Sequence, residues 1–94
     1  MEPKMEIDRL GNKFWRLPNI IKHRTDGPAI EWVDGDKWWF LNGEQHRIDG
    51  PAIECMDGST QWWLHDAEMT FDEWLRCTPG LTDEGKVMMK LQYG

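Results

Sequence analysis

Two short segments of the chain place an imidazole three residues before a carboxylate. His23 precedes Asp26, and His46 precedes Asp49. Histidine and aspartate at this spacing are able to hold zinc or to relay a proton. A catalytic or metal site is usually built once, however, whereas a structural bond is needed in every copy of a repeat. The duplication therefore favours a structural role, and we expect no catalytic residue, metal or cofactor here.

The duplicated segments belong to a longer internal repeat. Residues 23–35 return as residues 46–58, with ten of the thirteen positions identical. Self-similarity at this period indicates one supersecondary unit stacked on copies of itself. The chain is therefore expected to be a small repeat protein.

Beyond Gly58 the two copies match again if one residue is inserted. This alignment makes Trp62 the counterpart of Trp38 and Trp63 the counterpart of Trp39. A degenerate copy of the tryptophan-containing half of the repeat lies upstream of the first full unit. We expect one domain with four parts, namely a degenerate half repeat over 8–22, repeats over 23–45 and 46–69, and a tail over 70–94.

Each unit has the residue pattern of strands and tight turns. Asn42-Gly43 lies between apolar runs, and Asn-Gly favours a type I′ hairpin turn because both central residues need a positive φ. Asp34-Gly35-Asp36 separates two further runs in the same way. The sequence predicts a mainly β protein, an antiparallel hairpin meander with a short helical tail.

An Asp-Gly-Pro tripeptide stands where one unit passes to the next. Proline lacks a ladder donor and glycine permits a bulged backbone, so such tripeptides mark strand entry. The aspartate is expected to accept hydrogen bonds in the turn, with the preceding imidazole or guanidinium as its partner. The predicted turn residues are Asp26, Gly27, Pro28, Asp49, Gly50 and Pro51.

The tail begins with a helix signal. Thr70 and Glu73 have the spacing of a capping box, which predicts a helix over 71–77 that ends before Pro79. Residues 82–93 alternate like a strand but contain good helix formers. We favour a short helix with Thr82 as its cap and keep the strand as the alternative.

Strand alternation divides the tryptophan strands into two faces. The face expected to form the core carries Trp15, Trp39, Trp63, Leu17, Leu41 and His65. The opposite face is only partly covered in this scheme, and tryptophan and arginine are frequent in interface hot spots. The candidate partner-binding residues are Arg16, Trp38, Phe40, Trp62 and Leu64.

The repeated His-Arg-x-Asp-Gly-Pro-Ala-Ile-Glu, followed by Asp-Gly, Trp-Trp and Asn-Gly, resembles hairpin repeats of small phage and bacterial proteins. These repeats are loosely similar to MORN repeats. The resemblance covers residues 8–69. It implies a β-meander and a phage setting, but no catalytic residues.

Composition narrows the range of partners. The 94 residues carry a net charge of −6, which disfavours direct binding to nucleic acid or to anionic lipid. The sequence has neither an export signal nor a membrane-spanning stretch, and its two cysteines lack a Cys-x-x-Cys spacing. We expect a reduced, cytoplasmic protein, located in the host cytoplasm if phage-encoded.

These observations favour a non-catalytic module that binds another protein. The leading interpretation is a small phage-type inhibitor or modulator of a bacterial host protein, acting in antiviral defence. A binder that sequesters a nucleotide or another small ligand is the first alternative. A structural homodimer and an acidic nucleic-acid mimic are the others.

Overall fold

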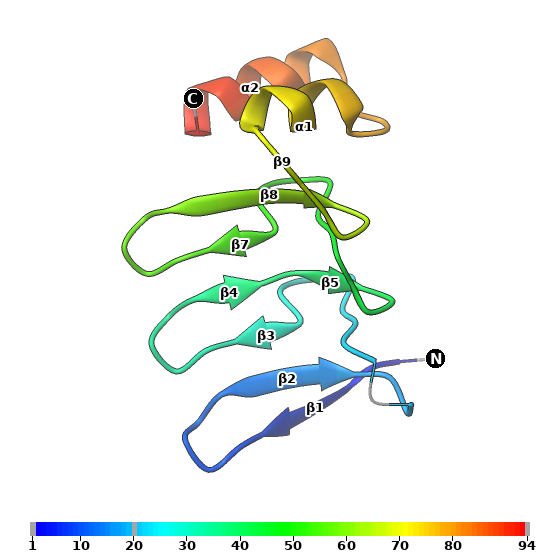
Figure 1. The fold of residues 1–94 in the computed structure, drawn as a ribbon, viewed down its shortest axis with the longest axis vertical. Helices are drawn as coiled ribbons and strands as arrows, with labels where there is room; N and C mark the ends of the chain where they lie inside the picture. Colours follow the sequence, from blue (N-terminus) through cyan, green and yellow to red (C-terminus); the bar gives the residue numbers. More distant parts are fainter. Residues whose placement is uncertain (1, 20, 94) are drawn as a thin grey trace.

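The computed structural model describes residues 2–19 and 21–93. Successive hairpins lie one above the other, and two helices close one end of the stack (Figure 1). The elements in chain order are β1 (Lys4–Ile7), β2 (Lys13–Arg16), β3 (Ile30–Glu31), β4 (Lys37–Trp38), β5 (Phe40–Leu41), β6 (Glu44–Gln45), β7 (Ile53–Glu54), β8 (Thr60–Leu64), β9 (Ala67–Met69), α1 (Phe71–Cys77) and α2 (Asp83–Tyr93).

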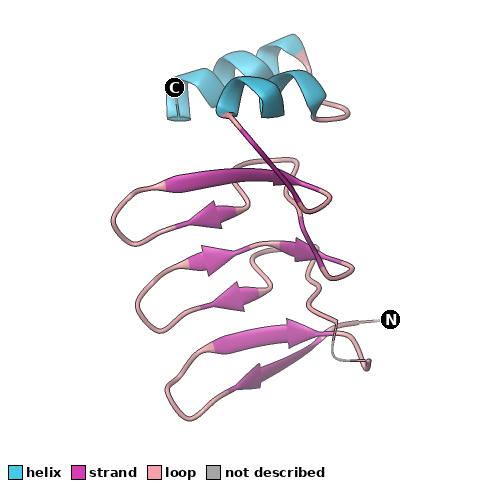
Figure 2. Ribbon diagram, in the orientation of Figure 1, coloured by secondary structure: helices cyan, strands magenta, loops and turns pink. Residues whose placement is uncertain are grey.

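Seven of the strands form one antiparallel sheet. Their order is β1-β2-β3-β4-β7-β8-β9, while β5 and β6 pair separately as a small second sheet. Each hairpin of the stack thus hydrogen-bonds to the next one through neighbouring strands (Figure 2). The predicted hairpin meander with a helical tail is confirmed.

The tips of the three stacked hairpins share one loop geometry. In the middle hairpin the Gly35 N–H donates to the Trp32 carbonyl at 2.9 Å, and Gly35 has a φ of 103°. Gly58 makes the same bond to Cys55, and Gly11 makes it to Asp8. The upstream copy is therefore a complete hairpin that starts at Lys4, before the predicted boundary at residue 8.

The strand register corrects our alignment of the two full repeats. Trp38 pairs with Ile30, and Gln61 pairs with Ile53. Both partners advance by 23 residues, so Gln61 and not Trp62 takes the place of Trp38. The predicted insertion of one residue is therefore wrong. Equivalent positions of the two full units are 23 residues apart throughout.

The turns at the other end of the hairpins support the same register. Asn42 and Gly43 have φ values of 51° and 84°, as a type I′ turn requires. His65 and Asp66 occupy the equivalent turn with φ values of 47° and 67°. Because this second turn contains no glycine, its sequence did not reveal it as the counterpart of Asn42-Gly43.

With this register, Trp62 and not Trp63 becomes the counterpart of Trp15 and Trp39. Trp62 is only 6% exposed, whereas Trp63 is half-buried. The expectation that Trp63 is a core residue equivalent to Trp39 is therefore wrong. Trp39 itself is also only half-buried.

Aromatic residues of the tail cover Trp62. Its ring centroid lies 4.6 Å from that of Trp74, 4.7 Å from Phe71 and 5.1 Å from Tyr93. Trp74 is fully buried, and its indole N–H donates to the Arg47 carbonyl at 3.0 Å. The helices thus serve as a cap that replaces the next repeat.

Both helices begin where the sequence indicated. The Thr70 side chain accepts from the Glu73 N–H, and the Glu73 side chain accepts from the Thr70 N–H, which completes the capping box of α1. The Thr82 hydroxyl accepts from the Gly85 N–H at the start of α2. Residues 83–93 are helical, so the strand alternative is excluded.

Candidate functional site

Each repeat arginine is held by its own unit and stacks on the tryptophan of the unit before it. Arg47 donates to Asp49 at 2.8 Å, to the Pro51 carbonyl at 3.0 Å and to Glu54 at 2.6 Å. Its Cζ lies 3.8 Å from the ring centroid of Trp39. The aspartate and proline of the predicted turn therefore serve to fix a guanidinium.

The first repeat has the same arrangement around Arg24. This arginine donates to Asp26, to the Pro28 carbonyl and to Glu31, and its Cζ lies 3.9 Å from the centroid of Trp15. The guanidinium lowers the pKa of Asp26 through a hydrogen bond and through its charge. Two copies of one contact set thus join three successive units.

The glycines of the tripeptides leave room for the guanidinium groups. A Cβ on Gly50 would lie 2.6 Å from Arg47 Cζ, and a Cβ on Gly27 would lie 3.0 Å from Arg24 Cζ. A side chain at either position would have to displace the guanidinium, and neither glycine has a positive φ. The arginine, aspartate, glycine and proline of the repeated motif therefore form one set of packing contacts in each repeat.

The repeat histidines bind the backbone of the following turn. His23 Nδ1 accepts from the Asn42 N–H at 2.9 Å, and His46 Nδ1 accepts from the His65 N–H at 3.0 Å. An imidazole accepts at Nδ1 only when that nitrogen carries no proton. At His46 the folded state therefore requires the neutral imidazole.

This requirement predicts a loss of stability in mild acid. Partial burial, reinforced by neighbouring His65 and opposed by Glu44, holds the pKa of His46 below its usual 6.5. The unfolded chain then takes up the proton first, so the stabilisation is complete above pH 6.5 and is lost as the pH falls below that value. Denaturant unfolding between about pH 8 and about pH 5.5 should show this decline. His46→Gln should reduce this pH dependence of the free energy of unfolding. A wild-type stability that rises on acidification would contradict the role of His46 Nδ1 as an acceptor.

A groove of about 610 Å³ lies between the two arginine units. Arg24, Arg47 and Trp39 line it, as a nucleotide site would require. Both guanidinium groups are already paired with carboxylates, however. An incoming phosphate would have to displace Asp26, Glu31, Asp49 and Glu54, which argues against an anion site.

On the opposite face of the sheet, three aromatic residues form a cluster, two of them from β2 and β4 and one from the loop that follows β3. We refer to Phe14, Trp32 and Trp38 as the aromatic cluster. The ring centroids of Phe14 and Trp32 are 5.7 Å apart at 84°, and those of Trp32 and Trp38 are 5.2 Å apart at 71°. All three side chains are half-buried, so the cluster retains apolar surface in contact with solvent.

The aromatic cluster contains two unused hydrogen-bond donors. The indole N–H groups of Trp32 and Trp38 are buried and donate to no acceptor within residues 2–19 and 21–93. Both residues border a hollow of about 460 Å³, which Asp34 and Asp36 also line. The hollow is therefore bordered by aromatic side chains and by carboxylates.

Of the five candidate partner-binding residues, only Trp38 belongs to the aromatic cluster and only Arg16 borders it. Arg16 lies beside the aromatic cluster, where the Arg16 Cζ is 4.6 Å from the ring centroid of Phe14. Phe40 belongs to β5 in the small sheet, where it pairs with Gln45. The Phe40 ring is contacted by Lys22, with Nζ 5.2 Å from its centroid, and makes none of the ring contacts that join the aromatic cluster.

Trp62 and Leu64 are not available to a partner. Each is 6% exposed and belongs to the core under the helices. Their proposed role in binding is wrong, because the tail covers this end of the stack. Trp32 was not among the predicted partner-binding residues, because its counterpart Cys55 carries no aromatic ring. Ile30 pairs with both Phe14 and Trp38, and this pairing brings the rings of Phe14, Trp32 and Trp38 together.

No family model, curated protein or solved structure matches this chain. Within the residues that the structure describes, no helix is long and apolar enough to cross a membrane. The same residues contain no group of three or more His, Cys, Asp or Glu side chains positioned to hold a metal ion. The aromatic cluster and its hollow are the candidate site because of their partly exposed rings, their two indole donors that are unpaired within the described part of the chain, and the carboxylates beside them.

Proposed function

We propose that this chain is a non-catalytic protein-binding module whose contact surface is the aromatic cluster. The observation that carries the proposal is the pair of buried indole N–H groups on Trp32 and Trp38 without acceptors. A buried donor without a partner is costly, so a ligand that supplies acceptors gains hydrogen bonds without breaking any in the free protein. Backbone carbonyls of a partner segment provide such acceptors after small side-chain rotations.

Charge indicates a basic partner segment. Asp34 and Asp36 line the hollow beside the indoles, and the whole chain carries a net charge of −6. A lysine or arginine of the partner would stack on an indole and approach a carboxylate. The chain already uses such stacking internally, where Arg47 lies over Trp39.

The resemblance to phage repeats supports a biological setting for this binding. We place the protein in the host cytoplasm as a small inhibitor or modulator of a bacterial host protein, in the context of antiviral defence. Non-catalytic action fits a chain whose repeated histidines and aspartates are occupied by structural bonds. Occupying a partner's surface requires only an exposed, complementary patch.

The proposal predicts that the aromatic cluster controls affinity. A partner is first recovered from bacterial lysate with the tagged protein, and its binding is then measured by titration calorimetry. Trp38→Ala and Trp32→Ala should each weaken binding by about 30-fold or more, as loss of a hot-spot tryptophan does.

Phe40→Ala is the matched control, because Phe40 is a half-buried aromatic residue of β5 whose ring makes none of the contacts of the aromatic cluster. It should retain wild-type affinity. Thermal melts of all three variants separate lost binding from lost folding. Equal loss of affinity in Phe40→Ala, or unchanged affinity in Trp38→Ala, would exclude the aromatic cluster as the contact surface.

A further inference from the structure

The two ends of the repeat stack differ in how they are closed. The helices cover the β8–β9 end, whereas β1 forms the opposite end of the sheet and has only β2 beside it (Figure 1). All four residues of β1 are exposed, including Met5 at 43% and Ile7 at 57%. An uncapped edge strand is a template for pairing with another strand.

Hydrogen bonds identify which backbone groups of β1 point outward. Trp15, the partner of Met5, uses its N–H and carbonyl on the side of Ala29 and His23. Neighbouring residues of a strand alternate in direction, so Met5 also directs its N–H and carbonyl away from β2. The Asp8 N–H donates inward to Asn12, which fits this alternation and places the Ile7 groups outward as well.

We infer that this edge pairs with β1 of a second copy of the chain, in an antiparallel arrangement centred on Met5. In that register Lys4 of each copy lies opposite Glu6 of the other copy. The two Met5 residues exchange their backbone hydrogen bonds. Each Ile7 N–H faces the carbonyl of Pro3 in the other copy. The two seven-stranded sheets then form one continuous sheet about a two-fold axis.

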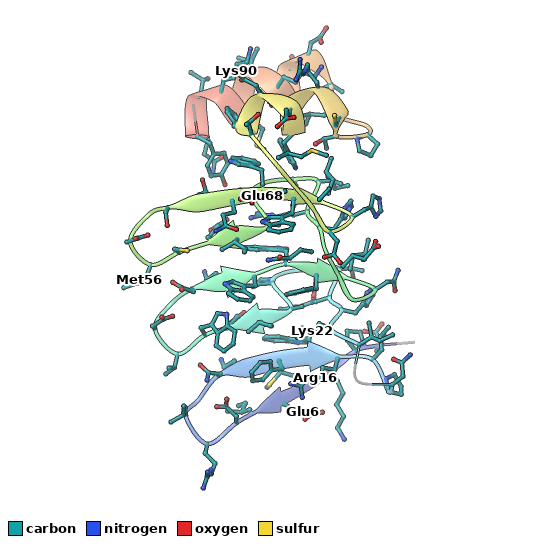
Figure 3. All side chains as sticks on the ribbon, in the orientation of Figure 1. Glu6, Arg16, Lys22, Met56, Glu68 and Lys90 are labelled. Atoms are coloured by element: carbon teal, nitrogen blue, oxygen red, sulfur yellow. The ribbon has the colours of Figure 1, made fainter. Side chains whose placement is uncertain are left out.

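Backbone direction and charge together select this register over its neighbours. An axis at Glu6 is excluded because Glu6 directs its backbone groups toward β2. An axis at Ile7 places Glu6 opposite Asp8 of the other copy. Like charges directly opposite are destabilising in antiparallel pairs, whereas opposite charges stabilise them. Glu6 keeps its contact with Arg16 on the same hairpin, at 3.5 Å (Figure 3).

The interface is small, because a single short strand contributes it. We therefore expect a weak, concentration-dependent dimer rather than an obligate one. Sedimentation velocity from about 10 µM to about 1 mM should show the wild type passing from monomer to dimer. A wild type that stays monomeric over this whole range would overturn the inference.

Charge reversal tests the register directly. Lys4→Glu and Glu6→Lys should each weaken self-association by about tenfold or more, since each places like charges opposite one another twice. In an equimolar mixture, Lys4 of the Glu6→Lys chain lies opposite Glu6 of the Lys4→Glu chain, and the two introduced side chains, which have opposite charges, lie opposite each other. The mixture should therefore associate as strongly as the wild type, and a mixture no stronger than either variant alone would contradict the pairing.

Two further variants separate this edge from the aromatic cluster. Met5→Pro removes only an outward N–H and should abolish dimer formation while the thermal melt stays close to that of wild type. Trp38→Ala should leave the dimer unchanged. If Trp38→Ala dissociates the dimer and Met5→Pro does not, self-association uses the aromatic face and the β1 assignment is wrong.

Discussion

Replacing Trp62 with alanine is expected to lower the free energy of unfolding by about 3–5 kcal/mol. Trp62 is almost fully buried and contacts three aromatic residues of the helical cap. Its loss leaves a cavity between the last hairpin and the helices. A domain of 94 residues has a total stability of about 5–15 kcal/mol, so the variant is expected to be largely unfolded at modest denaturant.

The neighbouring tryptophan provides the matched control. Trp63 is half-buried, and its indole N–H bonds only to Gln61 on the same strand. Trp63→Ala should cost about 1–2 kcal/mol. Urea unfolding followed by circular dichroism compares the two variants. A larger loss in Trp63→Ala than in Trp62→Ala would contradict the strand register.

Removing the guanidinium of Arg47 is expected to cost about 2–3 kcal/mol. The side chain is 15% exposed, stacks on Trp39 and binds the Pro51 carbonyl together with two carboxylates. Gly50→Ala should cost about 1–3 kcal/mol, since its new Cβ would lie 2.6 Å from Arg47 Cζ.

A double-mutant cycle distinguishes this steric cause from a general effect of changing a glycine. In the Arg47→Ala background no guanidinium opposes the new methyl group, so Gly50→Ala should cost less than about 0.5 kcal/mol. The coupling is measured by urea unfolding of the two single variants and the double variant. Additive losses would show that Gly50 is required for another reason than the space that Arg47 occupies.

The amino-acid sequence predicts the fold well where the signal is local. The turn at Asn42-Gly43 and the capping box of Thr70 and Glu73 depend on neighbouring residues alone, and both form as predicted. The register between repeats depends on contacts distant in sequence. The adjacent pairs of tryptophans suggested an insertion, whereas the His46 bond to the His65 N–H sets the constant spacing.

The candidate site was predictable only in part, for the same reason. In the observed register, Trp62 lies under the helices, whereas Trp38 lies on the open face. Trp32 joins Trp38 through cross-strand packing, which its position at the start of a loop does not reveal. The repeated arginine motif was recognisable as structural because it is duplicated, but the stacking on Trp39 required the three-dimensional arrangement.

Residue-resolved hydroxyl-radical footprinting with mass spectrometry tests the register most directly, because it reports the solvent exposure of each tryptophan in the intact protein. The structure predicts that Trp62 and Trp74 are protected from oxidation, whereas Trp63 and Trp38 are labelled. Denatured protein, in which all of them react, provides the reference. Protection of Trp63 together with labelling of Trp62 would contradict the constant spacing of 23 residues and the assignment of the open aromatic face.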